Sequence, residues 1–428
     1  MACALVWGQL ATPAFAETPV PNTPAGRTLQ AFLDAFNSAD HAKLDAYVKT
    51  YDPGETSDAL LSFSSRTGGF ALLSIERNAT DFINFRVKGR SDNIEAFGNL
   101  QLSSTFPPKV KTLSIRPLPP GAVIDDITLD ANSRQHVIDS VSSRLTEYYV
   151  YPEIAQKMNQ AIDDHQKHGD YSTITDGNQF AEALTRDLRA ISHDRHLRIN
   201  YDPYKPTQPD PQANSAEIAH YRIELEHNNC SFTKIEILPH NIGYLRFDEF
   251  ADPGLCGPTV TAAMNFLAHV DAIIFDLREN HGGNPSMVQF IVSYLFDKPT
   301  HINDLYNRHD DTTTQYWTLP YVPGPRLIGK PAYVLTSSRT FSGAEEFAYD
   351  LQTQKRATIV GEITAGGAHP VRGMPAGDHF TIGVPLGRPI NPVTKTDWEG
   401  TGIQPNVKVP ASDALAAAQK LAAENPIK

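Results

Sequence analysis

The spacing of apolar residues divides the chain into segments of three kinds. In the first, apolar residues recur at helical spacing on both sides of a polar break: Leu29, Phe32, Leu33, Phe36, Leu44, Tyr47 and Val48. Runs typical of strands follow at residues 70–76, 82–87, 94–102 and 110–115. Helices followed by a meander of strands predict a small α+β domain over residues 27–118.

The second segment, residues 119–200, follows a proline-rich stretch and is predicted to be mainly helical. It contains two apolar stripes at helical spacing: Val137, Ile138, Val141 and Leu145, then Phe180, Leu184, Leu188 and Ile191. The second helix ends in a polar turn that places His196 just ahead of a short strand. A histidine in such a turn is most often solvated or structural, so the pattern alone assigns it no role.

In the third segment, short apolar runs alternate with helical stretches. Strands are predicted at residues 242–247, 272–277, 332–335 and 358–360, and helices at 258–270, 285–296 and 341–351. This alternation predicts an α/β fold with a mainly parallel sheet, whose functional residues lie at the ends of strands. We assign residues 201–428 to this core.

The stretch of residues 332–351 is predicted to form a strand, a turn and a helix, with Ser342 where the helix begins. Its hydroxyl would lie among backbone N–H groups that have no partner inside the helix, which suits a nucleophile. The same residues fit a capping box, in which Ser342 caps the helix and Glu345 reaches back to it. The stretch by itself leaves both interpretations open.

A glycine pair, Gly282 and Gly283, follows a predicted buried strand and opens the next helix. Glycines there let backbone N–H groups approach a substrate closely and could form an oxyanion hole. The pair is equally typical of an ordinary tight turn. It is not a nucleotide-binding loop, since neither a Walker spacing nor GxGxxG is present, and no HExxH or CxxC motif indicates a metal site. We therefore expect no cofactor and no metal.

The net charge limits which binding partners are expected, and the N-terminal residues indicate the cellular compartment. The 428 residues carry a net charge of −12 without a basic block, which argues against nucleic acid and anionic membranes and favours small molecules or peptides. Residues 1–16 are apolar and end in Ala-Phe-Ala, as in a signal peptide cleaved after Ala16, although its basic leading region is missing. The alternative is an ordinary N-terminal extension.

Export would place the protein in the periplasm or outside the cell. No later apolar run is long enough to span a bilayer. Two cysteines, Cys230 and Cys256, remain after removal of residues 1–16. They could form one disulfide in an oxidising compartment, or be two buried thiols in a reducing one.

Four ordered motifs make a family resemblance specific. The runs DAIIFDLRENHGGNP, TSSRTFSGAEEFAYDLQ, IVGEITAGGAHP and TDWEGTGIQPNVKV resemble successive signatures of the S41 peptidases, which include tail-specific and tricorn-core proteases. LRAISHDRHLRI is similar to the branch that contains the interphotoreceptor retinoid-binding proteins. The resemblance covers residues 125–410 and implies a crotonase-like (ClpP-like) β-α core. In the first domain, FLDAFNSAD resembles nuclear transport factor 2 and implies an accessory role.

Within this resemblance, Ser342 matches the nucleophile. Glycine stands where one branch has a catalytic lysine, so a Ser-Lys dyad is not expected. His196 matches the general base of the tricorn-like branch, and Glu399 matches its supporting acid. Arg195 departs from the serine that usually precedes this histidine, so the contacts that support the base must differ or be absent.

The remaining site residues are implied by the same motifs. Backbone N–H groups of Gly282 or Gly283, together with Gly343, would form the oxyanion hole. His369 is an alternative base, and His281 is a further candidate for substrate binding. The resemblance thus implies a cofactor-independent serine peptidase, either an endopeptidase or a C-terminal-processing peptidase, that hydrolyses peptide or protein substrates through an acyl-enzyme.

A non-catalytic binding protein for an apolar ligand, such as a retinoid or fatty acid, is the alternative function. The presence of all three matched catalytic residues favours the enzyme, whereas the departure at Arg195 leaves the alternative open. A PDZ-like insert between the helical segment and the core is not evident, so selection of a free C-terminal tail by such a module is not expected.

Overall fold

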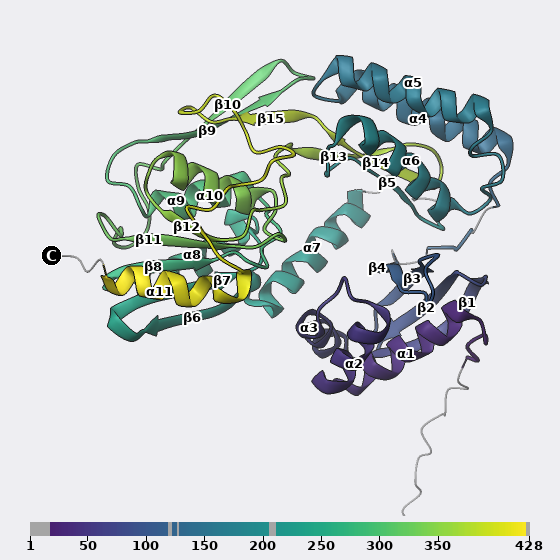
Figure 1. Ribbon diagram of the computed structural model, residues 1–428, viewed down its shortest axis with the longest axis horizontal. Coiled ribbons are helices and arrows are strands. Elements are labelled where there is room, and N and C mark those ends of the chain that lie inside the picture. The colour runs from purple at the N-terminus through teal and green to yellow at the C-terminus, as the bar shows by residue number, and fades with distance from the viewer. Residues whose placement is uncertain (1–17, 119–121, 126–127, 205–210, 425–428) are drawn as a thin grey trace, which may run out of the picture. The chain divides into compact units, whose positions relative to one another are not determined.

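The first of two structural units, residues 1–126, packs three helices against one face of a four-stranded antiparallel sheet (Figure 1). The computed structural model describes residues 18–118, 122–125, 128–204 and 211–424. The elements of this unit are α1 Pro24–Ser38, α2 His41–Tyr51, α3 Ser57–Thr67, β1 Phe70–Asn78, β2 Phe82–Gly89, β3 Glu95–Leu102 and β4 Val110–Pro117. The predicted helices and strand meander are confirmed, whereas the proposed signal peptide lies outside the described residues.

Local chemistry explains where this unit begins. Thr23 caps α1 by accepting a hydrogen bond from Gly26 N–H at 3.0 Å, and Pro24 occupies the first helical position, where its missing N–H costs nothing. The strands then follow in sequence order, so each turn joins neighbours in the sheet. Helix α3 was not predicted, because only one of its buried residues, Leu60, is apolar.

The second unit, residues 127–428, is built on a six-stranded sheet in the order β16-β12-β11-β8-β7-β6. Its strands are β6 Phe232–Leu238, β7 Ile242–Phe247, β8 Ala272–Asp276, β11 Ala332–Thr336, β12 Thr358–Gly361 and β16 Val407–Lys408. All neighbouring pairs are parallel except β6 and β7. The predicted α/β core is confirmed, with an antiparallel strand at one edge.

Helices cover both faces of this sheet (Figure 1). One face packs against α8 Pro253–Phe266, α9 Pro285–Ser293 and α10 Gly343–Thr353, and the other against α11 Ala414–Glu424. Because β7, β8 and β11 are parallel, the loops that follow them meet at one edge of the sheet. These loops carry the glycine pair and Ser342.

Helix α8 begins five residues before its predicted start at Pro258. The side chain of Asp252 accepts a hydrogen bond from Gly254 N–H at 2.8 Å and caps the helix, and Pro253 takes the first helical position. The sequence prediction placed the wrong proline at the helix start. A proline is favoured at that position, but Asp252 is the better cap.

The predicted helical segment forms a second layer of the same unit. Helices α4 Ala131–Tyr148, α5 Pro152–His168 and α6 Gly177–Ser192 share a core with a small antiparallel sheet. Its strands are β5 Arg198–Tyr201, β13 Val371–Pro375 and β14 Phe380–Pro385. The boundary expected at residue 200 therefore falls inside a layer that takes two strands from the C-terminal part of the chain.

The remaining elements extend the core. Strands β9 His301–Asn307, β10 Thr312–Trp317 and β15 Gly387–Ile390 form a three-stranded antiparallel sheet, and α7 Pro211–His227 leads into β6. Three short 3₁₀ turns span Asn229–Ser231, Pro239–Asn241 and Ala411–Asp413. Within the described ranges, no helix is both long enough and apolar enough to cross a membrane.

Cys230 and Cys256 are joined by a disulfide that links the residues before β6 to α8. They are 26 residues apart in sequence. Closing a loop of this length removes conformational entropy from the unfolded chain and stabilises the fold by about 3 kcal/mol.

We expect the double variant Cys230→Ala/Cys256→Ala to lose about 3 kcal/mol of unfolding free energy, measured by urea denaturation. A double change avoids leaving one unpaired thiol. Mass measurement after alkylation, with and without reduction, reports the bond directly. Two thiols that alkylate without reduction in freshly purified, exported protein would contradict the pairing.

Candidate active site

Ser342 lies at the start of α10 in a backbone conformation that serine rarely adopts. Its φ is 55° and its ψ is −122°. Positive φ brings Cβ into conflict with the backbone, so it persists only where surrounding contacts hold it. A serine at a strained turn between a strand and a helix is typical of a nucleophile elbow, which exposes the hydroxyl.

The buried carboxylate of Glu345 holds this turn in place. It accepts hydrogen bonds from Ser342 N–H at 2.9 Å and from Thr364 Oγ1 at 2.5 Å. The N–H groups of Gly366 and Gly367 donate to it at 2.7 and 2.9 Å. Burial raises the pKa of Glu345, and the four hydrogen bonds oppose that shift. The predicted reach of Glu345 back to Ser342 is therefore present, and it also fixes the loop of residues 364–367.

The glycine pair lies directly against the Ser342 turn. A Cβ added to Gly282 would be 2.6 Å from Gly343 N and 2.7 Å from Ser342 Cβ, so no larger residue fits. The N–H of Gly282 is already bound to Asn280 Oδ1 at 2.8 Å. Among the described residues, none accepts a hydrogen bond from Gly283 N–H or Gly343 N–H. Of the expected oxyanion donors, these two remain available.

His196 packs beside the residue that precedes Ser342. Its ring centroid is 4.5 Å from that of Phe341, and its backbone N–H donates to Asp194 Oδ1 at 3.0 Å. Its Nδ1 is buried, and no described residue bonds to it. The loop of residues 364–367 also approaches, because a Cβ on Gly367 would lie 2.8 Å from His196 Cε1.

His369 is the histidine that contacts carboxylates. Its Nδ1 lies 2.6 Å from Asp194 Oδ2 and 3.6 Å from Glu399 Oε2. Tyr149 OH donates to the same Asp194 oxygen at 3.4 Å. Glu399 Oε2 also accepts a hydrogen bond from Ala368 N–H at 2.6 Å. Asp194 thus touches both histidines, whereas Glu399 contacts the His369 side of the site.

These surroundings shift the pKa values of the two histidines in opposite directions. Burial lowers the pKa of His196 to about 4, despite the opposing charge of Asp194. Burial also lowers the pKa of His369, but the hydrogen bond and charge of Asp194 outweigh it, so that pKa is raised. Burial and the charge of Asp194 raise the pKa of Glu399 to about 7. At neutral pH, His196 is a neutral imidazole.

Asp194, His369 and Glu399 are also the described residues whose donor atoms come close enough to suggest a metal ion. One donor atom from each lies within 4.8 Å of the others. However, His369 Nδ1 and Asp194 Oδ2 are 2.6 Å apart, whereas two ligands of a tetrahedral zinc ion stand about 3.3 Å apart. The geometry is that of a hydrogen-bonded pair.

His281 and Arg195, which the sequence analysis also singled out, lie at the margin of this site. His281 is exposed, and its N–H donates to Asp248 O at 3.1 Å. The guanidinium of Arg195 donates to Ala365 O at 2.6 Å, so it ties its turn to the loop before His369. Sequence reasoning missed Asp194, although its place two residues before His196 was the available signal.

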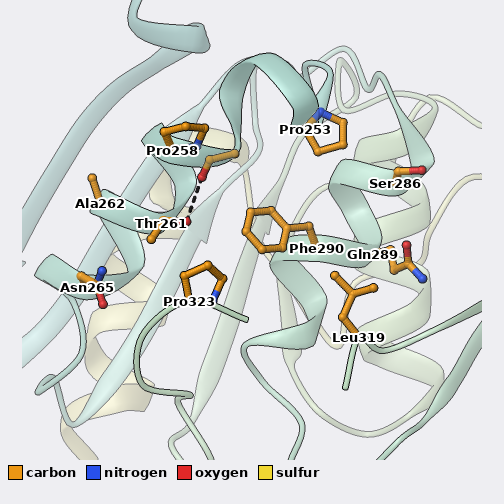
Figure 2. A pocket seen from close by; sticks show the side chains of 11 residues that line it. Pro253, Pro258, Thr261, Ala262, Asn265, Ser286, Gln289, Phe290, Leu319 and Pro323 are labelled. Carbon is orange, nitrogen blue, oxygen red and sulfur yellow. Dashed lines mark hydrogen bonds between the residues drawn. The ribbon is translucent and has the colours of Figure 1, made fainter. Parts of the chain in front are cut away.

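A separate apolar groove of about 740 Å³ lies between α8 and α9. Figure 2 shows Phe290 near its centre, with Pro258 and Pro323 on one side and Gln289 and Leu319 on the other. Ser286 and Pro253 lie at the helix N-termini that border it. None of the residues that line it is a predicted catalytic residue.

The sequence pattern of peptidase family S41 matches residues 241–409, and that of the N-terminal domain of peptidase S41 in eukaryotic IRBP matches residues 127–235. The chain belongs to peptidase family S41. The family resemblance and the fold class inferred from sequence are thereby confirmed. Both S41 patterns lie within residues 127–409, so the resemblance of the first unit to nuclear transport factor 2 still rests on its sequence.

Solved structures similar to this S41 chain include the photosystem II D1 C-terminal processing protease, at 15% identity and a TM-score of 0.43, covering 65% of this chain and 94% of that one. The tricorn protease is 12% identical with a TM-score of 0.42, covering 82% and 41%. A lipoprotein from Streptococcus agalactiae is 13% identical with a TM-score of 0.46, covering 70% and 99%.

We expect Asp194→Asn to lower the pKa of both His369 and His196, because the Asp194 charge raises both. NMR of protein labelled with ¹⁵N in histidine, followed across pH, measures both values. Asp187→Asn is a matched control, since Asp187 is also buried but accepts its hydrogen bonds from Tyr171 and Arg186. An unchanged His369 pKa in Asp194→Asn would contradict the contact.

Proposed function

We propose that this S41 protein is a serine peptidase that cleaves peptide bonds through an acyl-enzyme on Ser342. The observation that carries the proposal is the strained conformation of Ser342 beside two backbone N–H groups for which no described residue supplies an acceptor. A helix cap alone needs no positive φ at its serine, since capping residues ordinarily have extended backbone conformations. The conformation therefore favours the nucleophile over the simple cap.

The proposed chemistry begins at His196. Its Nε2 accepts the proton of the Ser342 hydroxyl as Oγ bonds to the substrate carbonyl carbon, and Gly283 and Gly343 N–H stabilise the oxyanion. His196 then donates that proton to the leaving amine as the C–N bond breaks. Water, deprotonated by the same nitrogen, attacks the acyl carbon, and His196 returns that proton to Ser342 Oγ as the acyl C–Oγ bond breaks.

The surroundings of His196 support its role as the base. Its low pKa keeps it neutral and able to accept a proton at neutral pH. Its Nδ1 is buried, which leaves Nε2 as the nitrogen that can reach a substrate. Glu399 lies beside His369, with its Oε2 3.6 Å from His369 Nδ1, so any support that it gives to His196 passes through His369.

The alternative, a binding protein for an apolar ligand, has the apolar groove between α8 and α9 in its favour (Figure 2). That groove is open, and it is separate from the residues that the family resemblance points to. We rank it second because a binding function does not require the strain at Ser342. Export to the periplasm or beyond fits either function and rests on residues 1–16 and on the disulfide between Cys230 and Cys256.

A fluorophosphonate probe should label Ser342, and Ser342→Ala should abolish the labelling. His196→Ala should slow labelling by several orders of magnitude, up to about 10⁶-fold, as loss of the base does in serine triads. The rate should fall only as pH approaches about 4, where His196 takes up a proton. A fall that begins above pH 6.5 would point to His369, whose pKa is raised.

Gly367→Ala should slow labelling strongly, because the added methyl would clash with the Phe341 ring at 2.1 Å and with His196 Cε1 at 2.8 Å. The expected loss is on the order of 10²-fold, as for small displacements of reacting groups. Gly373→Ala is the matched control, since a Cβ there meets nothing within 4 Å. Equal labelling rates for the two variants would contradict the placement of His196.

A further inference from the structure

The carboxylate of Asp194 connects the two histidines of the site. Oδ1 accepts the backbone N–H of His196 at 3.0 Å, and Oδ2 contacts Nδ1 of His369 at 2.6 Å. Asp194 is fully buried and lies two residues before His196. The orientation of the Asp194 carboxylate therefore links His369 to the turn that carries the proposed base.

His369 lies where a positive charge would balance the carboxylates of Asp194 and Glu399. Two carboxylates, Asp194 and Glu399, approach its Nδ1, and the His369 side chain is almost entirely buried. With a neutral His369 and both acids ionised, two negative charges would face each other away from water, which is strongly unfavourable. A proton on Nε2 of His369 offsets that repulsion, whereas the Nδ1–H that Asp194 accepts is present in either state of the ring.

We propose that His369 is a positioning residue: as a cation between Asp194 and Glu399, it holds the Asp194 carboxylate and, through it, the turn that carries His196. This inference rests on the proposed function and adds a role that Ser342, His196 and the oxyanion donors do not supply. A cation cannot accept the Ser342 proton, so His369 is not the base. Its positive charge also disfavours protonation of His196.

The charges that surround the two histidines determine how the rate of Ser342 labelling depends on pH. His196 faces Asp194, His369 and Arg189. His369 faces Asp194, Glu399 and Asp397, and its ring lies 5.6 Å from that of Tyr151. Replacing His369 by a neutral residue removes one of these charges, and it is a charge that opposes protonation of His196. The acid limb of the labelling rate should therefore move to higher pH.

Two substitutions separate the charge of His369 from its hydrogen bond. In His369→Asn, an amide N–H can take the place of Nδ1–H and still donate to Asp194, but the charge is lost. In His369→Leu, both are lost. We expect Ser342 in His369→Asn to be labelled within about tenfold of the wild-type rate, with the acid limb at higher pH. In His369→Leu we expect a loss of about 10-fold to 100-fold, the usual cost of removing a residue that orients another.

His379→Asn is the matched control, because His379 is also a buried histidine, with Nδ1 2.9 Å from Asp202 O. It should leave both the rate and the pH profile unchanged. Circular dichroism and thermal melting report whether each variant folds. If His369→Leu does not fold, the comparison of His369→Asn with the wild-type protein still tests the inference.

The possible results are distinguishable. A loss in His369→Asn as large as in His196→Ala would make His369 the base and overturn the inference. A wild-type rate and pH profile in both His369 variants would overturn it as well. A folded wild-type protein that is never labelled at Ser342 would instead overturn the proposed function on which the inference rests.

Discussion

The site depends on one buried carboxylate. Glu345 is fully buried and accepts four hydrogen bonds, from Ser342, Thr364, Gly366 and Gly367. A carboxylate in such surroundings is tolerable only when its oxygens are satisfied, so these donors cannot separate without a large penalty. The first turn of α10 and the loop of residues 364–367 are thus held together, and that loop in turn packs on Phe341 and His196.

The electrostatics of the site follow from which histidine has a carboxylate partner. His369 has Asp194 at hydrogen-bonding distance, and its pKa is raised, whereas the ring of His196 has no bonded carboxylate among the described residues, and its pKa is lowered. Opposite pKa shifts of neighbouring groups are the usual way in which one site separates a proton acceptor from a group that keeps its proton to higher pH. The guanidinium of Arg195, the residue just before His196, donates a hydrogen bond to Ala365 O.

Sequence patterns predicted the features that depend on short stretches of chain. The strand, turn and helix around Ser342 and the reach of Glu345 back to it are local, and both are present. Features that need distant segments were missed. His369 and Asp194 are 175 residues apart, and β5 pairs with β14 across a similar separation, so no local pattern could reveal either contact. The start of α8 was misplaced because two prolines competed for the first helical position, and the cap at Asp252 decided it.

The oxyanion assignment shows how structure narrows a sequence prediction. Gly282 and Gly283 are equivalent in sequence, but Asn280 accepts the hydrogen bond of Gly282 N–H and leaves Gly283 N–H available.

The most direct test of the account is a crystal structure of the protein after reaction with a fluorophosphonate. We predict phosphorus bonded to Ser342 Oγ, with one phosphonyl oxygen about 2.7–3.1 Å from both Gly283 N and Gly343 N. An adduct on another residue, or a phosphonyl oxygen directed away from these two nitrogens, would contradict the account.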